Sequence, residues 1–243
     1  MEHAHTILTR NLREHSRLAA EDVEQITRLS HVVKQFEGNE DLIRQGDSPR
    51  AAALVLQGMV GRYHLLADGR RQYLSFHIVG DMPDAQGLFI EQMDHAVCAI
   101  GPAAIVFIPH ADIIKAFKAR PSLGFAVWRE TLIDAAIFRE AITNNSARPV
   151  LVRMTHLFCE LFYRGRASGV APHDRLALPL SLLQLGEALG MAIATVNRTL
   201  QRLRETGSAD FRDGVLTVKN WEKLIRIGEF NPAYLHLKKV PAL

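Results

Sequence analysis

The sequence predicts an α+β chain, in which an N-terminal part of short strands precedes a helical C-terminal part. Turn residues recur at intervals of 12, 11 and 11 residues, at Gly46, Gly58, Gly69 and Gly80. This spacing is typical of an antiparallel barrel or sandwich. Beyond residue 178, two short amphipathic segments and an Asp-Gly hairpin signal predict a helix-turn-helix with a β wing.

The N-terminal part divides into strands and two helices. Strand-like apolar runs cover 53–56, 60–65, 71–76 and 104–108. A short helix is expected over 20–29, with Glu21 and Asp22 in its first turn. Another helix is expected over 109–118, ended by Arg120-Pro121 because the residue before a proline disfavours helical backbone.

A longer amphipathic helix is expected over 125–142. One stripe of this helix follows alternating steps of three and four residues, and its single charged member is Arg139. The stripe consists of Phe125, Trp128, Leu132, Ala135, Arg139 and Ile142. A stripe of about two and a half heptads favours a two-fold coiled coil. The alternative is a helix that packs against its own barrel.

The segment after this helix is expected to be irregular. Asn144-Asn145-Ser146 should break the helix, and the stretch from Asn144 to Pro149 should act as a hinge. Arg148-Pro149 is expected to start a new helix, since proline suits the first helical position. Residues 164–174 are expected to form a loop.

The segment 178–207 carries the most specific signal. Ser181 and Gln184 form an S-x-x-Q capping box, which starts a helix at the next residue. Gly190 ends that helix, since glycine accepts the left-handed backbone that follows many helices. A second helix with an apolar stripe is expected over 193–205. Two helices joined by a short glycine-containing turn predict a helix-turn-helix, whose second helix enters the DNA major groove.

The polar face of the second helix supplies groups suited to base edges and phosphates. Arg pairs with a guanine edge, Asn or Gln pairs with adenine, and Thr or a further Arg can hold phosphates. The candidate DNA-binding residues are Ser181, Thr195, Asn197, Arg198, Gln201, Arg202 and Arg212. The alternative is an ordinary helical hairpin with a solvated polar face.

A wing should follow this motif. Asp213-Gly214 lies between two short strand-like runs and predicts a two-residue hairpin, with Arg212 near its tip. Asn220 is expected to cap a last helix over 221–228. Trp221 in that helix is expected to pack in the core.

Composition and charge agree with a regulator that binds nucleic acid. The chain has 243 residues, of which 48% are hydrophobic and 23% charged, so disorder is not expected. Residues 146–243 hold 14 Lys and Arg against 8 Asp and Glu, whereas residues 1–145 hold 15 against 18. A basic module joined to an acidic one favours DNA binding by the C-terminal part. A polar N-terminus and the lack of a long apolar stretch predict a cytoplasmic protein without a membrane span.

Four segments together resemble the Crp/Fnr family of bacterial transcription regulators: GNEDLIRQGD (38–47), LQGMVGRYHLLADGRRQYLSFHIVGD (56–81), RMTHLFCELFYR (153–164) and TVNRTLQRLRETG (195–207). The resemblance implies a double-stranded, jelly-roll-like β-roll sensor domain over 1–120. It also implies a dimerisation helix and hinge over 121–147 and a winged helix-turn-helix over 148–243. Such proteins are homodimers that bind palindromic double-stranded DNA at promoters and recruit or block RNA polymerase.

The resemblance also assigns roles to single residues. Arg198 matches the recognition-helix Arg that contacts guanine in the family. Many members carry Glu where this chain has Ala194, so a carboxylate that accepts from a cytosine amino group is missing. The operator is therefore expected to differ from the best-known consensus of the family.

The resemblance places the effector-pocket candidates at Asp84-Ala85 and His95-Ala96. Members that bind cyclic AMP carry a Gly-Glu and an Arg-Ser pair there, which hold the ribose hydroxyl and the cyclic phosphate. Ala85 offers no acceptor and Ala96 no donor, so the sequence disfavours cyclic AMP. Protonated His95 is the one group suited to an anion.

Other effectors are also constrained by residue type. Oxygen-sensing members hold an iron–sulfur cluster with several cysteines, and Cys98 and Cys159 are too few for one. The effector is left unknown and no metal site is assigned. A haem or metal held by His64, His77, His95 or His110 is the alternative to simple polar packing.

Two other function classes are open. The chain could be a ligand-sensing adaptor whose helix-turn-helix contacts only protein, or a β-barrel enzyme with a metal on His64, His77 and His95. No H-x-H is followed by a Glu in the expected register, and the sequence has no Walker loop, dinucleotide fingerprint, G-x-S-x-G or H-E-x-x-H motif, so no enzymatic activity is expected. A DNA binder loses affinity steeply with salt, such an enzyme binds stoichiometric metal, and an adaptor does neither.

Overall fold

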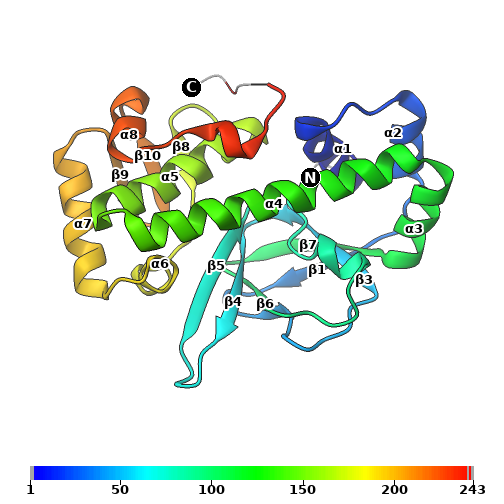
Figure 1. The fold of residues 1–243 in the computed structure, drawn as a ribbon, viewed down its shortest axis with the longest axis horizontal. Helices are drawn as coiled ribbons and strands as arrows, with labels where there is room; N and C mark the ends of the chain where they lie inside the picture. The colour runs from blue at the N-terminus through cyan, green and yellow to red at the C-terminus, as the bar shows by residue number, and fades with distance from the viewer. Residues whose placement is uncertain (1–2, 240, 242–243) are drawn as a thin grey trace. The chain divides into compact units, whose positions relative to one another are not determined.

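The computed structural model describes residues 3–239 and 241, which form two compact units that divide between Asp134 and Ala135 (Figure 1). The elements of the first unit are α1 (Ala4–His15), α2 (Ala20–Thr27), β1 (Val32–Phe36), β2 (Asp41–Ile43), β3 (Ala51–Gln57), β4 (Val60–Leu65), β5 (Arg71–His77), the 3₁₀ turn η1 (Ala85–Leu88), β6 (Ala96–Ala99), β7 (Ala103–Pro109) and α3 (His110–Ala119). The helix α4 (Pro121–Ala147) begins in the first unit and ends in the second.

The second unit continues with α5 (Val150–Ala167), β8 (Arg175–Ala177), α6 (Leu182–Leu189), α7 (Ile193–Glu205), β9 (Ala209–Arg212), β10 (Val215–Val218), α8 (Trp221–Ile227) and the 3₁₀ turn η2 (Pro232–Leu235). β8, β10 and β9 pair in that order as an antiparallel sheet. The mixed helix-and-strand class, the N-terminal β-roll, the long helix and the C-terminal helix-turn-helix predicted from the sequence are therefore confirmed.

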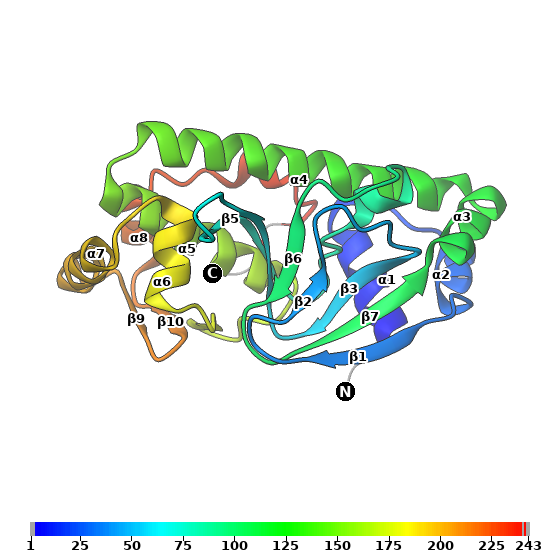
Figure 2. The ribbon, with the colours of Figure 1, turned by 90° about the horizontal axis from the view of Figure 1, so that it is seen from below.

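The β-roll consists of two antiparallel sheets with strand orders β1-β7-β3 and β2-β6-β4-β5 (Figure 2). Both faces of β3 are buried, which explains its nearly continuous apolar sequence. Leu54 belongs to a core shared with α1, α3 and the beginning of α4. Val55, on the opposite face, packs with Val60 and Val97 between the sheets. This two-sided burial gives the roll an outer helical layer and an inner core.

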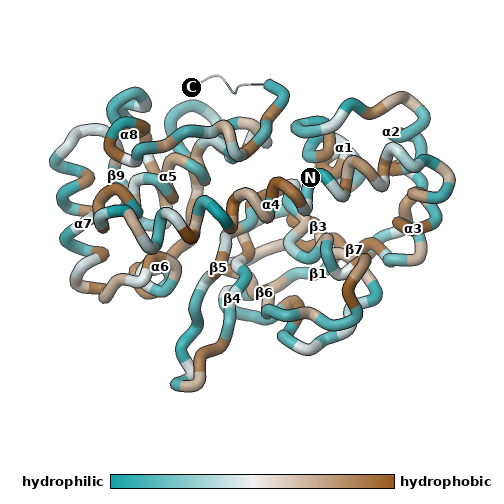
Figure 3. Tube along the Cα trace, in the orientation of Figure 1, coloured by the Kyte–Doolittle hydropathy of each residue, from teal (hydrophilic) through white to brown (hydrophobic). Residues whose placement is uncertain are grey.

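The long helix differs from its prediction at both ends, since α4 runs over 27 residues. Asn144-Asn145-Ser146 does not break it, so that prediction was wrong. Asn144 Nδ2 donates to the Arg153 carbonyl at 3.0 Å, and Asn145 Nδ2 donates to the Ala188 carbonyl at 3.1 Å. Because these amides bond to α5 and α6, they do not compete with the backbone of α4. Figure 3 shows apolar and polar residues alternating along this helix.

The segment after α4 corrects two further expectations. Pro149 is the N-cap of α5 rather than its first helical residue. The predicted loop over 164–174 is wrong at its start, because α5 continues to Ala167 and an ion pair of 3.2 Å joins Arg164 to Glu160 one turn before. Phe158 of this helix packs on Phe211 of the wing, with ring centroids 5.3 Å apart.

Candidate DNA-binding surface

The helix-turn-helix begins at the predicted capping box. Ser181 Oγ accepts from the Gln184 N–H at 3.1 Å, and Gln184 Oε1 accepts from the Ser181 N–H at 2.9 Å. Gly190 ends α6 in the left-handed region, with φ of 63°. The capping box, the left-handed turn and the position of the second helix are thus confirmed.

Gly186 allows the turn to approach α6 closely. The Met191 N–H donates to the Gly186 carbonyl at 2.9 Å. A Cβ on Gly186 would lie 2.5 Å from the Met191 carbonyl oxygen, which is backbone and therefore cannot move away freely. The geometry of the helix-turn-helix thus depends on the absence of a side chain at this position.

We expect Gly186→Ala to lower the free energy of unfolding by about 1–3 kcal/mol, because the added methyl group overpacks the turn. Urea denaturation measures the change. Leu183→Ala, at an exposed position of the same helix, is the control and should change it by less than about 0.5 kcal/mol. Equal stability of the two variants would contradict the role given to Gly186.

The second helix, α7, separates its apolar and polar residues as expected. Val196, Leu200 and Leu203 are buried. The candidate residues Asn197, Arg198, Gln201 and Arg202 are exposed, and Thr195 is half-buried. Arg198 Nη2 donates to Thr195 Oγ1 at 3.2 Å, so the hydroxyl helps to orient the guanidinium group.

A groove of about 760 Å³ lies between the start of α6, α7 and the β9–β10 turn. It brings together five of the seven candidates: Ser181, Asn197, Arg198, Gln201 and Arg212. Thr195 and Arg202 lie outside this groove. The Asp213-Gly214 turn closes the wing with φ of 48° and 70°, which confirms the predicted hairpin.

Arg204 also lines the groove, and the sequence interpretation missed it. Its Nε lies 2.8 Å from Asp210 Oδ1, and Arg212 Nε lies 3.1 Å from Asp210 Oδ2. Burial alone would raise the pKa of Asp210, but its contacts with Arg204 and the charge of Arg212 hold that pKa below its usual value. The ionised carboxylate therefore positions two cationic groups. The three-residue spacing of Arg204 from Gln201, which places them on one helix face, was the available signal.

The predicted heptad stripe of α4 remains uncovered within the single chain. Phe125 and Trp128 are 62% and 54% exposed. Leu132 and Ile142 are also exposed, as is Arg139, and Ala135 is half-buried. The residues that α4 buries in the first unit lie on its other side and include Leu123, Ala126, Val127 and Ile133. Packing of the helix against its own barrel thus does not account for the stripe.

The effector-pocket candidates are buried and bonded to the protein itself. Asp84 Oδ1 accepts from the Ala53 N–H at 2.8 Å, and burial raises the pKa of Asp84 to about 7. His95 Nδ1 lies 2.6 Å from Asp94 Oδ1, while burial lowers the pKa of His95. Ala85 and Ala96 are buried and supply no polar side-chain atom.

Arg62 is a further polar residue of this region that the sequence interpretation missed. It is 1% exposed. Its Nε donates to the Pro83 carbonyl at 2.6 Å, its Nη1 to Asp134 of α4 at 2.5 Å, and its Nη2 to Gln86 at 3.4 Å. The guanidinium group therefore joins residues 83–86, which we call the effector segment because they include the candidates Asp84 and Ala85, to α4. The sequence signal for a buried Arg62 was its position two residues after the apolar Val60, which places both side chains on the same face of β4.

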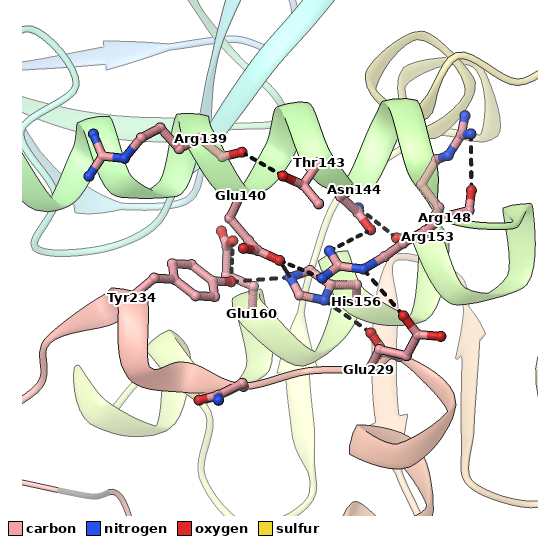
Figure 4. Close-up of polar contacts among 12 residues, drawn as sticks. Arg139, Glu140, Thr143, Asn144, Arg148, Arg153, His156, Glu160, Glu229 and Tyr234 are labelled. Atoms are coloured by element: carbon pink, nitrogen blue, oxygen red, sulfur yellow. Dashed lines mark hydrogen bonds and ion pairs between the residues drawn. The ribbon is translucent and has the colours of Figure 1, made fainter.

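Polar contacts also tie the end of α4 to the rest of the second unit (Figure 4). Arg148 Nη2 lies 2.7 Å from Glu140 Oε1, and His156 Nε2 lies 3.4 Å from the same oxygen. His156 Nδ1 is 3.0 Å from the Gly228 carbonyl, and burial lowers the pKa of this histidine. A bonded junction thus occupies the segment for which the sequence predicted a hinge.

A β-roll followed by a long helix and a winged helix-turn-helix, with a groove lined by three arginines, defines a class of DNA-binding regulators. A family model for the cyclic nucleotide-binding domain matches residues 33–120, and one for the Crp-like helix-turn-helix domain matches residues 152–227. The chain belongs to the Crp/Fnr family of transcription regulators. Among the described residues, no helix combines the length and the hydropathy needed to cross a bilayer.

Individual relatives are distant but similar over most of their length. The chain is 23% identical to the anaerobic regulatory protein of Haemophilus influenzae, covering 91% of this chain and 86% of that protein. It is 20% identical to the fumarate and nitrate reduction regulatory protein of Vibrio cholerae, with coverage of 85% and 82%. The structure of FixK2 from Bradyrhizobium japonicum matches with a TM-score of 0.73 and 23% identity, covering 82% of this chain and 98% of that one.

Proposed function

We propose that this regulator is a homodimer that binds a palindromic promoter site and changes transcription through RNA polymerase. The functional parts are a sensor domain over 1–120, a dimerisation helix over 121–147 and a winged helix-turn-helix over 148–243. The protein acts in the cytoplasm and catalyses no reaction. The groove that gathers Asn197, Arg198, Gln201, Arg204 and Arg212 is the observation that carries this proposal.

The chemistry of the groove matches two parts of a DNA duplex. Arg198 and Asn197 lie in the first half of α7, where a recognition helix contacts base edges. Arg198 has two donors suited to the acceptors of a guanine, and Asn197 matches adenine. Arg204 and Arg212, held by Asp210, suit phosphates, which position a protein on the duplex without reading its sequence.

Dimerisation follows from the stripe of α4. The stripes of two copies would pair as a coiled coil, which removes their apolar side chains from water. Each copy would contribute Phe125, Trp128, Leu132, Ala135, Arg139 and Ile142. A dimer with a two-fold axis presents two recognition helices about 34–36 Å apart, which matches successive turns of one face of the duplex. A ligand of the β-roll would act only through different affinities for two dimer geometries.

We expect Arg198→Ala to weaken binding to the selected operator by about 1–3 kcal/mol and to relax the preference at one base pair per half-site, because the guanine loses its donors. Fluorescence anisotropy with matched and substituted duplexes measures both effects. Arg226→Ala is the control, because Arg226 is exposed on α8 outside the groove. Equal binding of matched and scrambled duplexes by the unmodified protein would overturn the proposed function.

A further inference from the structure

The beginning of the recognition helix is apolar and exposed. Ile193, the first residue of α7, is 46% exposed, and Ala194 beside it is exposed as well. Single exposed apolar residues are common on protein surfaces and need no explanation by themselves. The position is informative here, because the N-terminal residues of a recognition helix contact base edges.

The neighbours of this apolar pair define what it would meet. Asn197 lies one turn after Ile193, and Arg198 lies one turn after Ala194, so the four residues share one side of α7. Asn197 and Arg198 are exposed, and the first turn of the helix contains no acidic residue. On this side of the helix, the apolar pair therefore lies one turn before the amide of Asn197 and the guanidinium group of Arg198. We call these four residues the leading face of α7.

Major-groove chemistry offers one apolar partner for such a pair. The edge of each base pair presents donors and acceptors, and thymine alone among the four bases adds a methyl group, at its C5. Alanine and other apolar side chains contact that methyl group in DNA complexes, whereas Asn pairs with the adenine edge. The leading face thus carries groups for an A·T pair beside the group for guanine.

We propose that Ile193 and Ala194 recognise the 5-methyl group of a thymine in each half-site of the operator. Ile193 supplies the larger surface, and Ala194 leaves room for the base to approach. Asn197 is placed for an adenine of the same or the adjacent pair. The proposal rests on the proposed function, since it requires α7 to lie in the major groove.

A comparison of thymine with uracil tests the proposal, because the two bases differ only by the methyl group. The operator is first selected from random duplexes with the unmodified 243-residue protein. Each thymine of a half-site is then replaced singly by uracil, and binding is measured for the unmodified protein and for Ile193→Ala. We expect one uracil position to weaken binding of the unmodified protein about fourfold, as the loss of one buried methyl group predicts.

The variant distinguishes a direct contact from other effects of the methyl group. Ile193→Ala should bind the thymine operator more weakly and should show no further loss when uracil replaces thymine at that position. Its salt dependence should equal that of the unmodified protein, because the contact carries no charge. Leu183→Ala, which removes another exposed aliphatic side chain of the motif, is the matched control and should keep the full sensitivity to uracil.

The outcomes separate this proposal from the function on which it rests. If no duplex is enriched, the proposed function and this contact both fail. If an operator is enriched but uracil affects the unmodified protein and Ile193→Ala equally at every position, only the thymine contact fails. Loss of the uracil effect in Ile193→Ala alone supports the contact. Equal melting temperatures of both proteins exclude misfolding as the cause.

Discussion

Trp128→Glu is expected to convert the proposed homodimer into monomers and to weaken operator binding. Trp128 lies in the exposed stripe of α4 and is 54% exposed in the single chain. Burial of such a side chain in an interface contributes about 2 kcal/mol for each copy. Two copies contribute about 4 kcal/mol, which corresponds to about a 1,000-fold change in the dissociation constant. The introduced carboxylates would lack partners in an apolar interface and would add to this loss.

Sedimentation velocity at micromolar concentration measures the change in association. Trp128→Leu is the control, because leucine keeps an apolar side chain at the same position of the stripe and should leave the protein dimeric. Operator binding should fall in parallel with dimerisation, since the two half-sites are then bound separately. An unmodified protein that sediments as a monomer, or a Trp128→Glu variant that remains a dimer, would contradict the assignment of this interface.

Asp84→Asn is expected to stabilise the β-roll at neutral pH and to leave it nearly unchanged in acid. Burial raises the pKa of Asp84 to about 7, whereas an unfolded aspartate titrates near 3.9. Below about pH 4 the carboxyl is protonated in both states, and its ionisation costs nothing. As the pH rises to 7 the unfolded state releases the proton first, so stability falls. Above the pKa of Asp84 in the folded state, the free energy of unfolding stays lower by the full cost of ionising the buried carboxyl.

The asparagine does not ionise, so the variant escapes this cost. The difference in free energy of unfolding between variant and unmodified protein should grow from near zero at pH 4 to about 4 kcal/mol at pH 8, as a shift from 3.8 to about 7 implies. Denaturation in guanidinium chloride across this pH range measures the difference. Asp68→Asn, at an exposed turn position, should show no such gain. A difference in free energy of unfolding that does not change with pH would contradict the raised pKa of the buried Asp84 carboxyl.

The helix-turn-helix was the most predictable part of the chain, because its signals are local. The capping box of Ser181 and Gln184, the left-handed Gly190 and the Asp213-Gly214 hairpin each depend on residues only a few positions apart. The polar side of α7 followed from helical periodicity alone. That Arg204 and Arg212 share Asp210 depends on the folding of the wing against α7, and no local pattern contains it.

Other parts required contacts between segments distant in sequence. Asn144 and Asn145 look like helix breakers, yet α5 and α6 supply acceptors for their side chains. Arg62 looks like a surface residue of a strand, yet Pro83, Gln86 and Asp134 satisfy its donors inside the roll. Tertiary partners override local preference in both cases.

Several elements were not predicted, among them α1, β1, β2, β6 and β8. α1 begins without a side-chain cap and has no acidic residue in its first turn, so only the spacing of Ala4, Ile7, Leu8 and Leu12 indicated it. β8 has only three residues, and it forms a strand because it pairs with β10. A single short strand of this kind has no stable conformation on its own.

Polar contacts at the end of α4 restrict movement of this segment. Glu140, Arg148 and His156 connect this end of the helix to the DNA-binding unit, so movement within 144–149 would break these contacts. The Arg62–Asp134 ion pair connects the effector segment to the same helix within the first unit. An effector bound at residues 83–86 would therefore lie beside Arg62, which contacts α4.

Selection of bound duplexes from a random pool, with the unmodified 243-residue protein, tests the proposed recognition of DNA by α7 most directly. The symmetric presentation of Arg198 by a dimer predicts an enriched palindrome with inverted half-sites whose centres lie about 10–10.5 base pairs apart. Each half-site should contain one guanine whose preference disappears in Arg198→Ala. Enrichment of a single unsymmetrical site, or of no sequence at all, would contradict the dimeric recognition of DNA by α7.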